Sequence, residues 1–80
     1  MFIKICGITR LADALNAARH GADALGFVFW PQSPRHIDPA RAAEIIGGLP
    51  EGVMSVGVFV NEPVDAIREI VEQSGISAVQ

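Results

Sequence analysis

The sequence predicts an α/β fold with a parallel sheet, because short apolar runs alternate with amphipathic helical patterns along its 80 residues. Four of these runs are expected to be strands, and they cover residues 2–8, 24–30, 54–60 and 76–80. Residues 25–30 and 55–60 are nearly continuous in apolar side chains, which is typical of strands buried on both faces of a parallel sheet. With three helices as crossovers between the strands, the predicted order is β-α-β-α-β-α-β.

The first helical pattern follows the first strand directly. Its apolar residues recur at the spacing of one helix face, and they are Leu11, Ala14, Leu15 and Ala18. Thr9 is the expected N-cap, because its hydroxyl can accept a hydrogen bond from a free backbone amide of the first turn. Gly21 is the expected residue just past the helix end, where a left-handed backbone favours glycine.

The other two helical patterns begin at prolines and end at glycines. Asp38 is the expected N-cap of the second helix, with Pro39 in its first turn, where a missing amide hydrogen costs nothing. The second helix ends at the Gly47-Gly48 pair, and the third is expected between Pro63 and Gly75. The apolar stripes are Ala42, Ile45, Ile46 and Leu49 in the second helix and Val64, Ile67, Ile70 and Val71 in the third.

The last predicted strand reaches Gln80, and no helix follows to cover it. A (β/α)₈ barrel typically has ~250 residues and at least ~200, so four strands with three helices match about half of one. A small open sheet of the flavodoxin type needs about five strands with their helices. On either interpretation we expect the chain to be part of a larger domain.

The composition excludes several classes of protein. Half of the residues are hydrophobic and 19% are charged, which indicates a globular chain. The net charge of −3 has the wrong sign for a nucleic-acid-binding patch, and no stretch approaches the ~18 apolar residues of a membrane span. The single cysteine cannot form an internal disulfide, and the N-terminus lacks the features of a signal peptide. We therefore expect a cytoplasmic protein that binds neither nucleic acid nor membrane.

The only cysteine, Cys6, lies near the end of the first predicted strand and precedes Gly7. Ligands and catalytic groups of α/β proteins gather at the carboxyl ends of parallel strands. A thiol at such a position can act as a base or a nucleophile if a cation or a helix N-terminus favours its ionised form. A lone cysteine in a strand can equally be a small buried hydrophobic residue, and its position alone leaves both interpretations open.

The loop between the second strand and the second helix, residues 30–36, contains the second candidate. Arg35 is its only fixed charge, and Pro31 and Pro34 stiffen the backbone around it. A guanidinium in such a loop can bind a carboxylate or a phosphate through paired hydrogen bonds, although a solvated surface arginine has the same pattern. A lone loop histidine such as His36 is more often exposed and without a function.

The remaining polar residues indicate structure rather than chemistry. Asn61 ends the third strand shortly before a proline, where asparagine is typical of a turn or a cap. Asp13 and Asp23 are interpreted as surface charges, the first favoured by its position near a helix N-terminus. His20 and His36 are too isolated for a zinc site, and the sequence has no glycine-rich phosphate loop and no paired carboxylates.

Four segments of the chain match known signatures when they are taken together. They are Lys4-Ile5-Cys6-Gly7-Ile8-Thr9, Gly21-Ala22-Asp23-Ala24-Leu25-Gly26-Phe27-Val28-Phe29 with Ser33-Pro34-Arg35, Gly57-Val58-Phe59-Val60-Asn61, and Val79-Gln80. In this order they resemble the N-terminal part of the phosphoribosylanthranilate isomerase family, and the last segment is similar to the start of that family's Gln-Leu-His-Gly strand end. The resemblance implies that residues 1–80 form the N-terminal part of a (β/α)₈ TIM barrel whose remainder is absent from this chain.

The resemblance also implies an activity in tryptophan biosynthesis, the aldose–ketose isomerisation of N-(5-phosphoribosyl)anthranilate by an Amadori rearrangement, without metal or cofactor. The position of Cys6 matches the family's general base, and that of Arg35 matches an arginine that contacts the anthranilate part of the substrate. The family's general acid and phosphate site lie in the second half of the barrel, so no aspartate of this chain is given either role. We therefore expect the 80 residues alone to be inactive.

Other interpretations stay open. One is a catalytically inactive barrel fragment that self-associates, or joins its missing half, through unpaired strand edges. Another is a different sugar-phosphate barrel such as indole-glycerol-phosphate synthase, which uses lysine and glutamate at its strand ends, and the Cys6-Gly7 signature argues against it. A flavodoxin-like module would have acidic residues at the end of the first strand, where this chain has Cys6.

Overall fold

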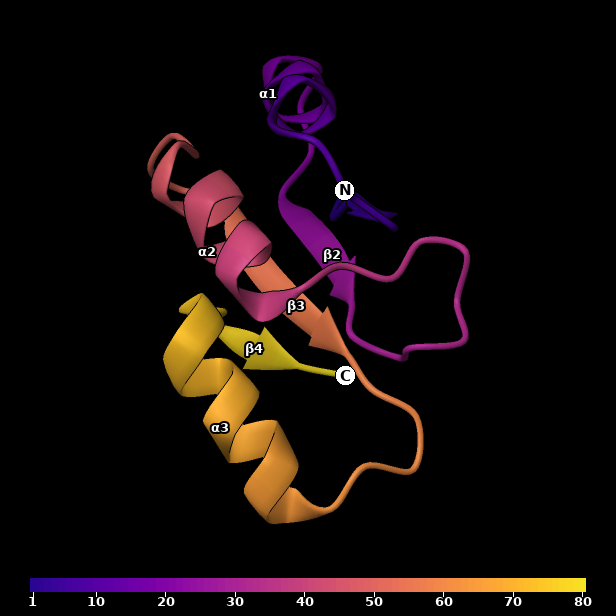
Figure 1. The fold of residues 1–80 in the computed structure, drawn as a ribbon. Helices are drawn as coiled ribbons and strands as arrows, with labels where there is room; N and C mark the ends of the chain where they lie inside the picture. Colours follow the sequence, from indigo (N-terminus) through magenta and orange to yellow (C-terminus); the bar gives the residue numbers. More distant parts are fainter.

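The computed structural model describes residues 1–80 as a four-stranded parallel sheet with three helices (Figure 1). Along the chain the elements are β1 (Lys4–Cys6), α1 (Leu11–Arg19), β2 (Ala24–Val28), α2 (Pro39–Gly47), β3 (Met54–Val58), α3 (Val64–Ser74) and β4 (Ala78–Val79). The strand order is β1-β2-β3-β4, and every neighbouring pair is parallel. The predicted alternation of strands and helices is therefore confirmed.

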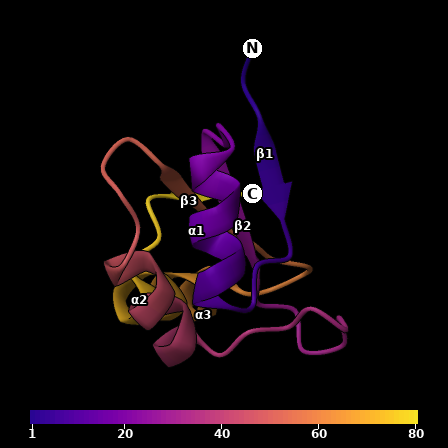
Figure 2. The same ribbon diagram turned by 90° about the horizontal axis from the view of Figure 1, so that it is seen from above.

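The three helices cover one face of the sheet. Because the strands follow one another without a reversal, right-handed crossovers place every helix on the same side. α2 packs against both α1 and α3, and Figure 2, seen from above, shows α1 in front of β2, with β1 at the edge of the sheet. None of the helices combines the length and the apolar composition that crossing a bilayer requires.

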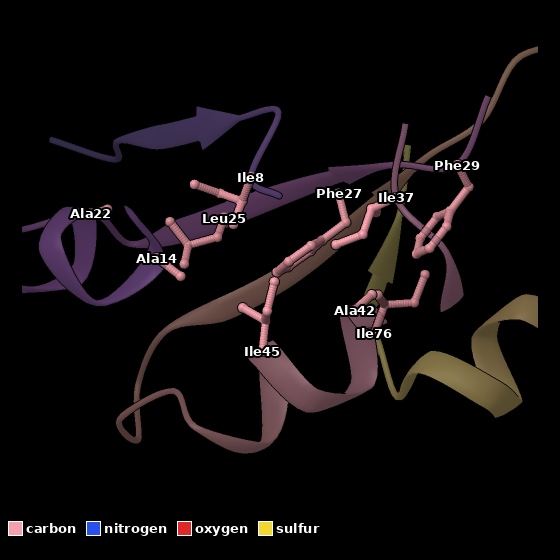
Figure 3. Packing of buried hydrophobic residues seen from close by; sticks show 10 residues of the cluster. All are labelled: Ile8, Ala14, Ala22, Leu25, Phe27, Phe29, Ile37, Ala42, Ile45 and Ile76. Carbon is pink, nitrogen blue, oxygen red and sulfur yellow. The ribbon is translucent and has the colours of Figure 1, made fainter. Parts of the chain in front are cut away.

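The hydrophobic core lies between the helices and alternate residues of the strands. It consists of Ile8, Ala14, Ala22, Leu25, Phe27, Phe29, Ile37, Ala42, Ile45 and Ile76. Figure 3 shows Ala14 of α1 near Leu25 and Ile45 of α2 near Phe27, and all four side chains are fully buried. Because side chains alternate along a strand, Gly26 faces the opposite side of the sheet, away from the helices.

Each strand is shorter than the sequence predicts, and local backbone geometry explains where β1 ends. At Gly7 the backbone has a φ of +87°, and Gly7 N and Ile8 N both donate to Gly26 O instead of continuing the ladder. After β3, Asn61 adopts a φ of +53°, a left-handed conformation that asparagine tolerates. The interpretation of Asn61 as a turn residue is therefore confirmed.

The predicted helix boundaries hold with one exception. Asp38 is the N-cap of α2, and its Oδ1 accepts a hydrogen bond from Ala40 N at 3.4 Å. Gly75 ends α3 in a left-handed conformation, as expected. Thr9 is not the N-cap of α1, because the chain stays extended through Arg10, which holds that position without any side-chain hydrogen bond. The burial of the preceding Ile8 in the core is consistent with this later helix start.

Asp23 is an anchor rather than the surface charge that the sequence suggested. Its Oδ2 accepts a hydrogen bond from Ile3 N at 2.8 Å, and its own backbone N donates to Ile3 O at 2.8 Å. Its backbone carbonyl accepts from Met54 N at 2.9 Å. Asp23 therefore ties the amino ends of β1, β2 and β3 together. Asp13 fits its interpretation, since it is exposed and lies 4.0 Å from Arg10, in an ion pair that contributes little.

A pair of serines fastens the last strand to the sheet. Ser55 N donates to Ser77 Oγ at 3.1 Å, and Ser77 N donates to Ser55 Oγ at 3.0 Å. Ser77 Oγ also donates to Ser55 O at 3.0 Å, and the two hydroxyl oxygens lie 3.3 Å apart. Ser55 is buried, so these side-chain bonds are shielded from competing water and extend a strand pairing that covers only two residue pairs.

Ser55→Ala is expected to lower the free energy of unfolding by about 1 kcal/mol, the net contribution of a typical hydrogen bond. The substitution removes one of the two acceptors of Ser77 N, which also donates to Ser55 O at 3.0 Å, and it removes the contact between the two hydroxyl groups. Urea unfolding of the chain measures the loss. The control is Gln73→Ala on the exposed side of α3, which should change stability by less than about 0.5 kcal/mol. Equal stability of the two variants would show that the serine pair does not fasten β4.

Candidate functional site

The candidate site lies at the carboxyl edge of the sheet, where the strands lead into their loops. Since all strands are parallel, these loops emerge on the same side. The loop after β2 is the longest of the three that follow a strand, and Figure 1 shows it as a wide excursion away from the helices. In α/β folds this edge is where ligands bind.

Cys6 is the last residue of β1, and its thiol is exposed. It is paired in register with Gly26, so both residues share the face of the sheet that the helices leave open. The alternative interpretation, a small hydrophobic residue buried in the core, is therefore wrong. The thiol is available to a small molecule at the carboxyl edge.

Gly26 makes the room in which the Cys6 side chain lies. A Cβ atom built on Gly26 would be 2.9 Å from Cys6 Sγ and 3.2 Å from Cys6 Cα, closer than such contacts allow. The bonds that Gly7 N and Ile8 N donate to Gly26 O, at 3.0 and 3.1 Å, fix the backbone on the other side of the cysteine. Cys6 is thus held by the strand pairing itself.

Arg35 lies against the residue that follows the cysteine. Its Nε and Nη1 would be 3.2 and 3.3 Å from a Cβ atom on Gly7, and its Cδ is closer still. The arginine is exposed, and its side chain crosses from the β2 loop back to the end of β1. The structure therefore brings together Cys6 and Arg35, which are 29 positions apart in the sequence and were identified separately.

Sequence reasoning missed Lys4 as part of this surface. Lys4 precedes Cys6 by two positions, so both side chains lie on the open face of the sheet. Its Nζ donates to Oε1 of Gln80, which follows β4. The ammonium therefore reaches across the face from the first strand towards the last. The two-residue spacing from Cys6 was the signal that could have identified it.

The other sequence candidates lie apart from this pair. His36 is exposed, and its backbone rather than its ring takes part in the loop. His20 is at the far end of α1, where its Nδ1 lies 2.8 Å from Asn16 O. No three His, Cys, Asp or Glu side chains come together in a way that could hold a metal ion. The site thus combines the Cys6 thiol with two cationic side chains, Lys4 on the same face of the sheet and Arg35 against Gly7.

Comparison with known proteins places the whole chain in one family. The family model described as N-(5′-phosphoribosyl)anthranilate (PRA) isomerase matches residues 3–80. The N-(5′-phosphoribosyl)anthranilate isomerase of Syntrophus aciditrophicus is 55% identical over 78 residues, which are 98% of this chain and 34% of that protein.

Solved structures agree closely with the fold. The phosphoribosyl anthranilate isomerase of Thermus thermophilus is 45% identical, with a TM-score of 0.98 over all of this chain and 40% of that one. A second isomerase structure, in complex with reduced 1-(o-carboxyphenylamino)-1-deoxyribulose 5-phosphate, is 49% identical, with a TM-score of 0.97 over all of this chain and 41% of that one. The chain thus spans between a third and about two fifths of the length of these relatives.

The contact between Arg35 and Gly7 gives a test of the site geometry. Gly7→Ala and Gly21→Ala both place a side chain on a backbone with positive φ, +87° and +96°, and each should cost about 1–2 kcal/mol of stability. Only the methyl group at Gly7 meets Arg35, because the space around Gly21 is empty within 4 Å.

The NMR signal of the Arg35 Nε–H group is therefore expected to shift in Gly7→Ala and to stay in place in Gly21→Ala. Urea unfolding gives the stability loss that the two variants share. An Arg35 signal that is unchanged in Gly7→Ala would mean that the Arg35 side chain does not lie against Gly7.

Proposed function

Because the chain belongs to the phosphoribosylanthranilate isomerase family, we propose that it supplies part of the active site of such an isomerase. The reaction is the conversion of N-(5-phosphoribosyl)anthranilate to 1-(2-carboxyphenylamino)-1-deoxyribulose 5-phosphate in tryptophan biosynthesis. The observation that carries the proposal is the exposed Cys6 at the end of β1 with the Arg35 side chain against the next residue. A cytoplasmic location, which the single cysteine favours, belongs to the same proposal.

Cys6 is the proposed general base. In the ring-opened substrate, the sugar forms a Schiff base with the anthranilate nitrogen, and the rearrangement removes the proton from C2. The Cys6 thiolate takes this proton, the C2 electrons form a double bond to C1, and the electrons of the C1–nitrogen double bond return to the nitrogen, which becomes a neutral amine because the Schiff base is protonated. The resulting enol loses its hydroxyl proton and gains a proton at C1, which gives the ketone. A base works only within hydrogen-bond reach of its proton, which favours a residue held on a strand over one on a mobile loop.

Arg35 is the proposed binding partner of the anthranilate part. The substrate carries a carboxylate on its aromatic ring, and a guanidinium can bind a carboxylate through two parallel hydrogen bonds. The position of Arg35 across Gly7 would hold the ring near Cys6. The relative with the bound 1-deoxyribulose phosphate compound shows that a ligand with such a carboxyphenyl group occupies that isomerase. The general acid and the phosphate site are proposed to come from other parts of the barrel.

The proposal is tested with a chimera in which this chain replaces the matching 40% of the Thermus thermophilus isomerase. The chimera is expected to be an active isomerase, and Cys6→Ala should lower its kcat by about 10²–10⁴-fold, the contribution of a general base. Gln73→Ala, remote from the site, is the control and should leave kcat unchanged. The 80-residue chain alone should show no turnover.

Two outcomes would contradict this assignment. A chimera that keeps its kcat after Cys6→Ala would remove Cys6 from the base role. An isomerase rate in the 80-residue chain alone, abolished by the same substitution, would show that the chain needs no further part of a barrel.

A second candidate role is self-association, and the exposed apolar edges of the sheet favour it. Ile5 in β1, Phe2 and Ile3 just before it, and Val79 in β4 at the other edge are all exposed. Unpaired strand edges with apolar side chains are templates for pairing with another chain.

If the edges pair, the mass of the chain in solution should rise with concentration. Analytical ultracentrifugation over a dilution series measures it. Ile5→Lys, which places a charge on the edge strand, should shift the mass towards the monomer, whereas the exposed Val64→Lys on α3 should not. A constant mass of 8.5 kDa at every concentration would contradict self-association.

A further inference from the structure

The loop that carries Arg35 is closed at its base. Val28 and His36 form an isolated parallel bridge, and Ile37 N donates to Val28 O at 3.0 Å. The Ile37 side chain is only 4% exposed and belongs to the core, so the returning strand of the loop is anchored. The freedom of the loop is therefore confined to the residues between these two points.

Within the loop, Ser33 makes three hydrogen bonds. Its backbone N donates to Trp30 O at 3.1 Å, and its carbonyl accepts from His36 N at 3.1 Å. Its Oγ accepts from Arg35 N at 3.1 Å. Of the three, only the bond to Oγ depends on the side chain of Ser33, and its donor is the backbone N of Arg35.

The direction of the Arg35 side chain depends on its backbone orientation. The Arg35 side chain reaches Gly7 only if the Arg35 backbone keeps its orientation. The hydrogen bond from Arg35 N to Ser33 Oγ restrains that orientation. We propose that Ser33 is a positioning residue whose Oγ holds the backbone of Arg35 so that the guanidinium lies against Gly7, the neighbour of Cys6, before any ligand binds. The expected effect of Ser33 on substrate affinity, through Arg35, rests on the proposed function.

The placement can be measured without an isomerase assay, by alkylation of Cys6 with anionic iodoacetate and neutral iodoacetamide. The ratio of the iodoacetate rate to the iodoacetamide rate rises with positive charge near the thiol, because only iodoacetate is an anion. In the native chain the ratio should exceed that in concentrated urea, and Arg35→Ala should lower it about threefold, the effect of one unit charge at roughly 6 Å in water.

If Ser33 positions Arg35, then Ser33→Ala should lower the ratio nearly as much as Arg35→Ala does. Ser33→Thr keeps a hydroxyl and should retain the high ratio, and Gln32→Ala, an exposed neighbour in the same loop, is the matched control that should also retain it. A native ratio equal to the ratio in urea, or an unchanged ratio in Ser33→Ala, would overturn the proposal.

The chimera described above gives a kinetic test. Ser33→Ala should raise KM about fivefold with kcat within about twofold, because the loss of one hydrogen bond weakens ground-state and transition-state binding alike. In an Arg35→Ala background the same substitution should have no further effect on KM, since Ser33 acts only through the arginine. A second fivefold rise in that background would indicate a general loss of loop structure and overturn the positioning role.

The two proposals can fail separately. An inactive chimera with the expected alkylation ratios would contradict the isomerase function and leave the placement of Arg35 by Ser33 supported. An active chimera that depends on Cys6 and Arg35 but is indifferent to Ser33→Ala would overturn only the positioning role.

Discussion

The close approach of β1 and β2 at Cys6 and Gly26 is the constraint on which the site depends. The thiol occupies the place where any other residue at Gly26 would put its side chain, and Gly26 O accepts the two amides that follow the cysteine. The strand pairing therefore fixes both the direction of the thiol and the point at which the chain leaves the sheet. Gly7 stands at that point, with a positive φ that favours glycine and with the Arg35 side chain across it. The absence of a side chain at Gly26 in β2 and at Gly7 just after β1 thus defines the space of the site.

The two faces of the sheet have different tasks. Leu25 and Phe27 pack under the helices and supply much of the apolar burial that stabilises the fold, at about 1.5–3 kcal/mol for a fully buried large side chain. The opposite face carries Lys4 and Cys6 and no helix. Parallel sheets are normally covered on both faces, and in a (β/α)₈ barrel the second face becomes the interior. The TM-score of 0.98 with the Thermus thermophilus isomerase shows that these four strands already have the curvature of its N-terminal part.

The sequence predicted the order of the elements because each one follows a local rule. Apolar runs, proline at a helix start and glycine at a helix end act over a few residues, and Asp38 and Gly75 behave as those rules require. Contacts between residues that are far apart in the sequence could not be predicted from such local rules. Asp23 looked like a surface charge, since nothing near it in the sequence indicates a bond to Ile3. The contact between Arg35 and Gly7 depends on how the β2 loop folds back, which Ser33 and the bridge at His36 determine.

The fold separates its stabilising contacts from its candidate site along the strand direction. The side-chain anchors stand towards the amino ends of the strands, where Asp23 ties β1 to its neighbours and Ser55 fastens β4 through Ser77. Cys6 and Arg35 lie at the opposite edge, among loops that those anchors do not touch. This division is typical of barrels, in which the carboxyl face carries function and the amino face carries stability. It follows that most residues at the carboxyl edge can be substituted to suit a ligand without lowering the stability of the sheet. Gly7 and Gly26 are exceptions, Gly7 because its backbone has a positive φ and Gly26 because it is part of the strand ladder and leaves room for the Cys6 thiol.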